Sequence, residues 1–182
     1  MRIISGRAKG RRLTAPDTPA TRPVTDRVRE AVFSIVGTWV EDAVVLDLYA
    51  GSGSFGLEAL SRGAAEVTFV ETGNRALEAL RANIKTVALG GTVVTSKVRE
   101  FIDRSGGKFD LVFIDPPWDL PSSVLGGELA DLDPLLGPDA EVVLSRRHTD
   151  EVPTTTAGWR VATDRRYGDT RIVRYEKEAD AV

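Results

Sequence analysis

The residues best suited to chemistry form a short run at the end of an apolar stretch. Asp115-Pro116-Pro117-Trp118 closes the expected strand Phe109–Asp115. Because proline has no N–H and fixes its own φ, carbonyl oxygens beside the two prolines stay outside any strand ladder. A carboxylate and a proline carbonyl that lie close together can accept the two N–H groups of an exocyclic amine. These two bonds hold the amine and direct its lone pair, and this geometry favours in-line displacement at an activated methyl. The Trp118 indole offers a face for a nucleobase, worth roughly 1–3 kcal/mol, which offsets the cost of taking that base out of its stack.

A second run is rich in glycine and spans residues 47–56, with the sequence DLYAGSGSFG. Its glycines match G-x-G-x-x-G between an expected strand and an expected helix. Glu71 lies 20 residues beyond Gly51, at the end of the next strand, where a carboxylate can accept both hydroxyls of a ribose. The pattern predicts a pocket for an adenosine-type cofactor.

NAD and S-adenosylmethionine both satisfy this pattern, and two details favour S-adenosylmethionine. Asp47 ends the strand just before the glycines, where its charge suits the ammonium group of a methionine moiety and repels a pyrophosphate. The NAD alternative lacks a hydride-transfer apparatus, since the single histidine, His148, is not evidently placed for it. The expected cofactor residues are Asp47, Tyr49, Ala50, Gly51, Ser52, Gly53 and Glu71.

The rest of the chain supplies elements that position these two runs. Apolar residues from Val28 to Trp39 recur at helical spacing, which predicts a helix begun by Thr25 or Asp26. Beyond it, apolar runs alternate with helical patterns. The expected strands are Val44–Tyr49, Val67–Val70, Thr92–Ser96, Phe109–Asp115, Glu141–Leu144, Trp159–Thr163 and Arg171–Tyr175. The expected helices are Ser54–Arg62, Asn74–Leu89, Val98–Arg104 and Ser122–Leu136.

This alternation predicts an α/β fold, a Rossmann-like doubly wound sheet of seven strands that is mostly parallel and ends in an antiparallel pair. We expect a short basic extension over residues 1–24 and one catalytic domain over residues 25–182. Ligands in such sheets bind at the carboxyl ends of the strands, where both runs fall. Trp39 and Trp159 are expected to pack in the core or against the sheet.

Composition excludes several classes of protein. The chain has 182 residues, no cysteine and one histidine, which excludes disulfide scaffolds, thiolate zinc sites, cysteine nucleophiles and histidine-rich metal sites. No metal is therefore expected. No apolar run is long enough to span a membrane, and the first residues lack the apolar core of a signal peptide. We expect a cytoplasmic monomer.

Charge is distributed unevenly along the chain. The net charge is −3, yet residues 1–30 carry eight Lys/Arg against three Asp/Glu, and residues 146–177 carry eight against five. A basic head and a mildly basic tail predict a shared anionic partner, for which RNA is the candidate. The residues expected to contact RNA are Arg2, Arg7, Lys9, Arg11, Arg12, Arg22, Arg27 and Arg29. Helix capping and surface ion pairs with Asp26 or Glu30 are the alternative for the last three of them.

Taken together, these residues resemble the class I S-adenosylmethionine-dependent methyltransferases that modify amino groups. More narrowly, the sequence is similar to the RsmD-type 16S rRNA (guanine-N2)-methyltransferases of bacteria, over roughly residues 1–176. The matching segments are MRIISG at 1–6, KGRRL at 9–13, TRPVTDRVRE at 21–30 with Phe33, DLYAGSG at 47–53, DPP at 115–117 and YGDT at 167–170.

The resemblance implies methyl transfer to the exocyclic N2 amine of a guanine in small-subunit rRNA, within a ribosomal particle or assembly intermediate. It also implies an adenine contact at Val98 and Arg99, after the third strand. Trp118 stands where many relatives carry Tyr or Phe, which keeps an aromatic face. The segment 145–148, SRRH, departs from the usual acidic-and-histidine pattern, and no catalytic role is assigned to it.

Two alternatives stay open at this point. One is an amino-methyltransferase on DNA adenine or a protein glutamine, chemistries that usually have Asn where this chain has Asp115. The chain is short and lacks a separate target-recognition domain, which weighs against sequence-specific DNA modification. The other is a non-catalytic RNA-binding assembly factor on the same scaffold, against which the intact Glu71, glycine run and Asp115 count.

Overall fold

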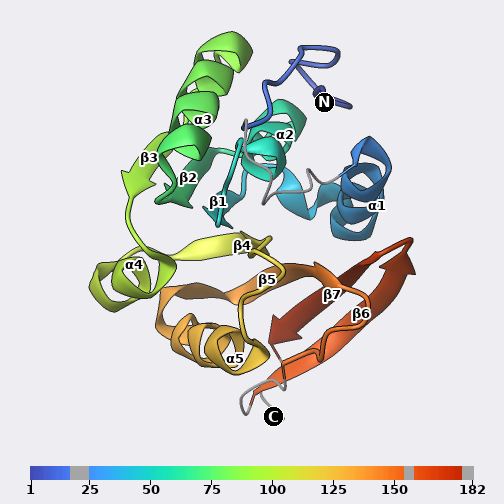
Figure 1. The fold of residues 1–182 in the computed structure, drawn as a ribbon, viewed down its shortest axis with the longest axis vertical. Coiled ribbons are helices and arrows are strands. Elements are labelled where there is room, and N and C mark those ends of the chain that lie inside the picture. The colour runs from blue at the N-terminus through green and yellow to red at the C-terminus, as the bar shows by residue number, and fades with distance from the viewer. Residues whose placement is uncertain (17–24, 154–157, 178–182) are drawn as a thin grey trace.

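The computed structural model describes residues 1–16, 25–153 and 158–177, and their core is one seven-stranded sheet (Figure 1). The strand order is β3-β2-β1-β4-β5-β7-β6. Of these strands, β7 alone runs in the opposite direction to the other six. The strands are β1 Val44–Leu48, β2 Glu66–Glu71, β3 Thr92–Thr95, β4 Phe109–Ile114, β5 Leu136–Arg147, β6 Trp159–Tyr167 and β7 Thr170–Lys177. The doubly wound, mostly parallel sheet is as the sequence predicts.

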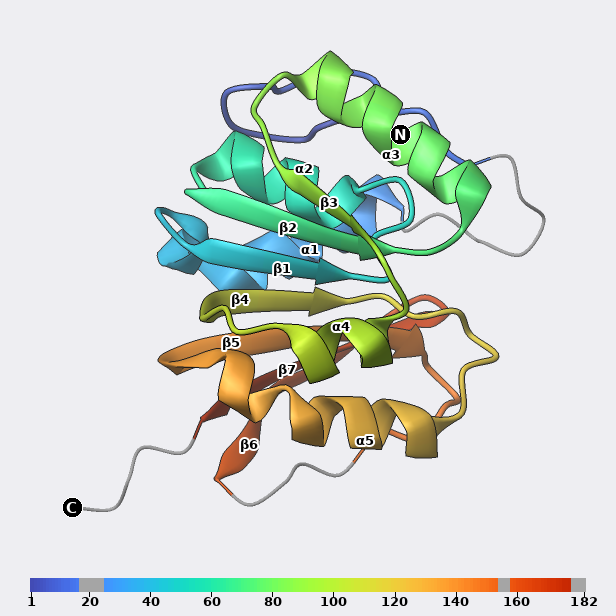
Figure 2. The same ribbon diagram turned by 90° about the vertical axis from the view of Figure 1, so that its left-hand side faces the viewer.

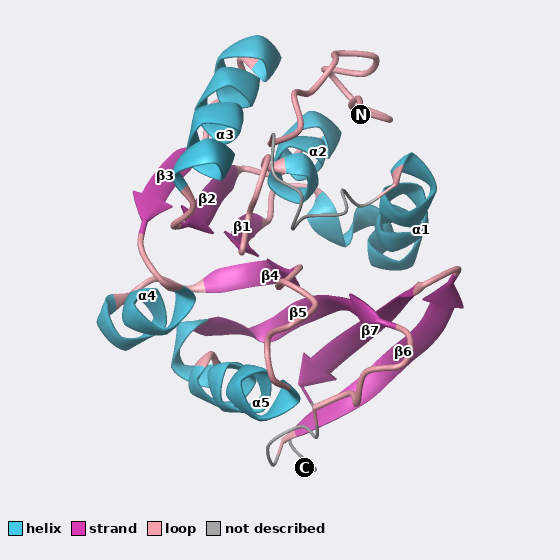
Figure 3. Ribbon diagram, viewed as in Figure 1, coloured by secondary structure: helices cyan, strands magenta, loops and turns pink. Residues whose placement is uncertain are grey.

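Helices cover both faces of the sheet (Figures 2 and 3). On one face lie α1, α2, α3 and the N-terminal segment, and on the other lie α4 and α5 (Figure 1). Each face has its own cluster of buried apolar side chains. The helices are α1 Asp26–Val36, α2 Ser54–Arg62, α3 Asn74–Val87, α4 Val98–Arg104 and α5 Ser122–Asp131, with 3₁₀ turns η1 at Gly37–Val40 and η2 at Asp133–Leu135.

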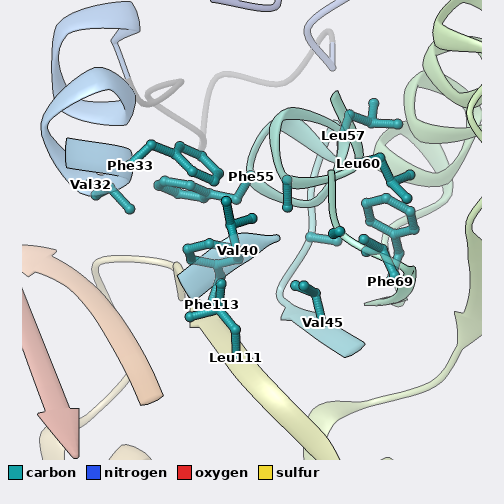
Figure 4. Packing of buried hydrophobic residues seen from close by; sticks show 14 of the residues in the cluster. Val32, Phe33, Val40, Val45, Phe55, Leu57, Leu60, Phe69, Leu111 and Phe113 are labelled. Atoms are coloured by element: carbon teal, nitrogen blue, oxygen red, sulfur yellow. The ribbon is translucent and has the colours of Figure 1, made fainter. Parts of the chain in front are cut away.

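Three phenylalanines join α1 and α2 to the strand that leads to Asp115 (Figure 4). Phe55 of α2 stacks on Phe113 of β4 at 5.2 Å between ring centres, and Phe33 of α1 meets the same ring at 5.4 Å. All three side chains are buried. Since interiors are packed as densely as crystals, this contact fixes the end of β4 relative to the start of α2.

Three expectations about elements need correction. The first helix ends at Val36, because Gly37 adopts φ 61° and turns the chain out of the helix. Trp39 consequently falls outside the buried stripe and is 45% exposed, so the expectation that it packs in the core is wrong. The last strands are longer than predicted, because antiparallel pairing continues to Arg147 between β5 and β7 and to Tyr167 between β6 and β7. Residues 122–136 are mostly helical, as expected, in α5 and η2. Trp159 is buried, as expected.

The N-terminal segment is docked on α2. Ile3 and Leu13 are buried in the core cluster of that face. The Glu58 carboxylate, itself buried, accepts the backbone N–H groups of Ile4 at 2.7 Å and Ser5 at 3.0 Å. The basic head is therefore held in place by the sheet's own helices, and the boundary expected at residue 24 lies outside the described residues.

Candidate active site

The loops that follow β1 and β4 lie side by side at one edge of the sheet (Figure 2). The two strands are parallel neighbours with Leu48 opposite Ile114. Beyond them, the Asp115 N–H donates to the Leu48 carbonyl at 3.5 Å. The glycine loop and the Asp-Pro-Pro-Trp loop, far apart in sequence, therefore open onto the same region.

Only one of the three motif glycines faces open space. Gly51 has φ 57°, and a Cβ placed there would meet only the Tyr49 carbonyl oxygen, at 3.9 Å. A Cβ at Gly53 or Gly56 would lie 2.4 Å from apolar side chains of α3 or β2. Gly51 therefore lets a ligand approach the backbone, whereas the other two glycines let α2 pack closely.

Glu71 is fixed at the tip of β2 by backbone donors. Its Oε2 accepts the Gly51 N–H at 2.8 Å, and its Oε1 accepts the N–H groups of Thr72 and Gly73, each at 2.7 Å. These three bonds orient the carboxylate and leave about one of its four lone-pair sites for a further donor, such as a ribose hydroxyl. Glu71 borders a pocket of about 240 Å³. The pocket is lined by Tyr49, Val70, Glu71, Thr72, Ser96, Lys97, Val98, Arg99 and Glu128.

Asp47 lies behind the glycine loop with half of its carboxylate unused. Oδ2 accepts the Gly56 N–H at 2.9 Å, whereas Oδ1 is buried without a hydrogen-bond partner in the described part of the chain. Burial raises the pKa of Asp47 well above its usual value, and the charges of Asp115 and Glu71 raise it further. An unpartnered acceptor among three carboxylates favours a cationic group, which fits the ammonium and sulfonium of S-adenosylmethionine better than a pyrophosphate.

Asp115 lies half-buried at the start of its loop. Burial raises the pKa of its carboxyl to about 6, although the neighbouring Ser145 hydroxyl opposes the shift by favouring the charged form. Pro116 is buried, Pro117 is exposed, and Trp118 is half-buried. The Arg147 guanidinium lies 5.0 Å from the centre of the Trp118 ring. A carboxyl group whose pKa is raised by burial is typical of a functional acceptor.

One site residue escapes sequence reasoning entirely. Glu128 of α5 is buried and accepts the Tyr49 hydroxyl at 2.7 and 2.9 Å, from across the cofactor pocket. Burial raises the pKa of Glu128, and the Tyr49 hydrogen bond and the charge of Arg99 oppose that shift. The two partners are 79 residues apart and no local pattern marks Glu128, so only the fold brings them together.

The basic residues of the head separate into two groups. Arg2, Lys9, Arg12 and Arg27 are exposed and available to a polyanion. Arg7 and Arg11 are exposed too, but their guanidinium groups donate to the carbonyls of Leu60 and of Thr86 and Val87, at the ends of α2 and α3. Cations at helix C-termini stabilise the helix dipole, so these two have a structural task in this structure.

Arg29 does not face solvent, and the expectation that it contacts RNA is corrected. Its side chain is fully buried and donates to the Arg2 carbonyl at 2.5 Å and to Asp26 at 2.8 Å. It joins α1 to the N-terminal segment, which is the ion-pairing alternative considered for this stretch. Arg22 lies outside the described residues.

Comparisons with known proteins agree with this geometry. A family model described as Conserved hypothetical protein 95 matches residues 1–176. The chain is 35% identical to the ribosomal RNA small subunit methyltransferase D of Escherichia coli K12, over 98% of this chain and 91% of that protein. It is 32% identical to the protein YlbH of Bacillus subtilis, over 97% and 99% of the two chains. The solved structure of yhhF from Escherichia coli superposes with a TM-score of 0.86 at 34% identity, over 99% of both chains.

None of the helices in the described part of the chain has the length and apolar character that a membrane crossing needs.

Proposed function

Because the chain belongs to the Conserved hypothetical protein 95 family, we propose that it is an S-adenosylmethionine-dependent methyltransferase that acts on the exocyclic N2 amine of a guanine in small-subunit rRNA. The observation that carries the proposal is the adjacency of the two loops, with the Asp115 N–H on the Leu48 carbonyl and the Asp115 charge acting on Asp47. The relative named as a small-subunit rRNA methyltransferase covers nearly the whole chain and supports the choice of substrate.

The cofactor pocket would be held by residues already in place. Glu71 would accept a ribose hydroxyl at its remaining lone-pair site, and Val98 and Arg99 would border the adenine. Asp47 Oδ1 would receive the ammonium group, directly or through a water molecule. When bound, S-adenosylmethionine supplies an activated methyl on a sulfonium. A bound cation would favour the ionised forms of Asp47 and Asp115, whose pKa values burial raises, so the site suits such a cation better than an anionic dinucleotide.

The substrate side is formed by the loop after β4. Asp115 and the Pro116 carbonyl would accept the two N–H groups of the guanine amine and direct its lone pair at the methyl. Trp118 would stack on the base, which offsets part of the cost of extruding it from the RNA. Asp115 need not be a strong base, because an aromatic amine loses its excess proton readily once methylated. The carboxylate mainly orients the amine and neutralises its developing charge.

The exposed cations of the head would bind phosphates of the RNA at a distance from the target base. Residues 1–16 lie along α2 and α3 (Figure 2), and Arg7 and Arg11, which flank Lys9, contact the C-terminal ends of these helices, opposite the ends that begin at the site. We propose a ribosomal particle or assembly intermediate as the substrate, because the small, fixed head alone offers few contacts to select one guanine. The protein would act in the cytoplasm as a monomer.

The test is transfer of labelled methyl groups to undermethylated small-subunit particles, with large-subunit particles and naked rRNA as controls. Nucleoside digestion of the product should give N2-methylguanosine with wild type and none with Asp115→Ala. Label on adenine N6 or on a glutamine amide would instead support the alternative amino-methyltransferases. Failure to bind S-adenosylmethionine in a titration would favour the non-catalytic assembly factor.

A further inference from the structure

The last residues of β5 lie against the loop that carries Asp115. Arg146 is only 2% exposed, and its guanidinium nitrogens Nη1 and Nη2 lie 3.4 Å from the Pro117 carbonyl and 3.0 Å from the Leu120 carbonyl. Asp150 forms an ion pair with the same Nη2 at 3.2 Å. Burial of a guanidinium is costly unless its donors are used. Here Nη1 and Nη2 donate to the backbone of the catalytic loop, whereas Nε is buried without a hydrogen-bond partner in the described residues.

The next residue along the strand reaches the same loop. The Arg147 guanidinium lies over the Trp118 ring, 5.0 Å from its centre. Side chains alternate between the faces of a strand, so Arg146 approaches the loop from one face of the sheet and Arg147 from the other. Two successive residues therefore contact the loop, one from each side.

We propose that Arg146 is a positioning residue for methyl transfer, which fixes the catalytic loop by bridging the carbonyl oxygens of Pro117 and Leu120. The proposal rests on the proposed function and names a residue that acts through the loop rather than on the substrate. Pro116 and Pro117 have no N–H, so within the loop the Pro117 carbonyl is held by the Leu120 N–H, and Arg146 adds donors from outside the loop.

A guanidinium suits this task because its planar fork presents several donors in a fixed geometry, whereas an ammonium is a single point charge. The direction of the Pro116 carbonyl follows from the backbone that Arg146 holds. Misplacement of a reacting group by about 1 Å costs about 100-fold in rate, so a freed loop should lose turnover while the cofactor pocket stays intact. Arg146, in the segment SRRH that departs from the family pattern, thus has a structural role in this chain and no catalytic one.

The experiment compares Arg146→Met, Arg146→Lys and a matched control, Arg174→Met. Arg174 is also a partly buried arginine on this part of the sheet, but it pairs with Glu141 and Glu176 away from the loop. Arg146→Met should lower kcat for the particle by about 100-fold, with KM and S-adenosylmethionine affinity little changed. Arg146→Lys, which can reach one carbonyl, should recover part of the loss. Arg174→Met should keep the wild-type kcat.

Hydrogen exchange gives a readout that needs no methyl transfer. The Leu120 N–H donates to the Pro117 carbonyl at 3.0 Å, inside the segment that Arg146 bridges. Its protection should fall in Arg146→Met and stay at the wild-type level in Arg174→Met. If Arg146→Met does not fold, Arg146→Lys and Asp150→Asn carry the same comparison.

Wild-type kcat in Arg146→Met, or unchanged protection of the Leu120 amide, would overturn the proposal. An equal loss in both the Arg146 and Arg174 variants would also overturn it, because that result indicates a general structural effect. If the wild-type protein methylates no rRNA, the proposed function fails, and the exchange measurement still decides whether Arg146 holds the loop.

Discussion

Replacement of Asp115 by asparagine should stabilise the protein while it damages catalysis. Burial raises the pKa of the Asp115 carboxyl from 3.8 to about 6. A shift of roughly two pKa units corresponds to about 3 kcal/mol of free energy, since each unit is worth about 1.36 kcal/mol. Asparagine keeps the shape of the side chain without a charge to bury. We therefore expect Asp115→Asn to raise the free energy of unfolding at neutral pH by about 1–3 kcal/mol.

The sign follows from proton linkage. Because the folded pKa is higher than the unfolded one, the folded state binds the Asp115 proton more tightly, and the stability that this binding supplies is lost as pH rises from about 4 through about 6. Asparagine does not titrate. The difference in stability between variant and wild type should therefore be smallest below about pH 4 and reach its full size above about pH 7.

Urea unfolding of both proteins across this pH range measures the difference. Asp119→Asn is the matched control, because Asp119 is an exposed carboxylate in the same loop, and it should follow the wild-type curve. A variant that is less stable than wild type at pH 7, with a difference that does not change with pH, would refute burial as the cause of the shift.

The same group predicts the pH dependence of methyl transfer. Only the ionised carboxylate is an acceptor for both the amine and its developing charge, so the rate at pH 5, about one unit below the pKa, should be roughly tenfold below its plateau. Asp115→Asn should retain a low rate without this acid limb, and Asp115→Ala should be nearly inactive. Equal, full activity of the three proteins would remove Asp115 from the mechanism.

Three further predictions concern the cofactor pocket and the head. Glu71→Ala should weaken S-adenosylmethionine binding by about 10- to 100-fold in calorimetry, because a charged acceptor for a ribose hydroxyl is lost; unchanged affinity would contradict the ribose assignment. Tyr49→Phe should lower the free energy of unfolding by about 1–3 kcal/mol, because the buried Glu128 carboxylate loses its donor, and a Glu128→Gln partner should reverse part of that loss in chemical denaturation. Lys9→Ala and Arg12→Ala should each reduce the slope of log affinity against log salt by about 0.7–0.9 if each engages one phosphate; a wild-type slope near zero would refute a phosphate-binding head.

The sequence predicts those parts of the site whose positions follow from the repeat of strand and helix. Glu71 could be placed because the distance from Gly51 to the tip of the next strand is set by one helix and one strand. Asp115 could be placed because its proline pair ends an apolar run. In both cases local spacing and the parallel sheet together determine where the side chain lies.

Contacts between distant segments could not be predicted in this way. Glu128 meets Tyr49, and Arg146 meets Leu120, only after α5 has folded back along the sheet. The pattern did contain a signal for Arg29, which lies four residues before Phe33 and seven before Val36, on the buried stripe of α1. Its charge favours contact with RNA, but its position on the buried face of the helix determines that the side chain is buried.

We propose that a guanine amine is held at Asp115 and Trp118 beside a bound methyl donor. The most direct test is mass spectrometry of nucleosides from the small-subunit rRNA of cells that lack this protein. We predict the loss of one N2-methylguanosine, its return with the wild-type protein and its continued absence with Asp115→Ala. Undiminished N2-methylguanosine in the deletion strain, or its return with Asp115→Ala, would contradict the account.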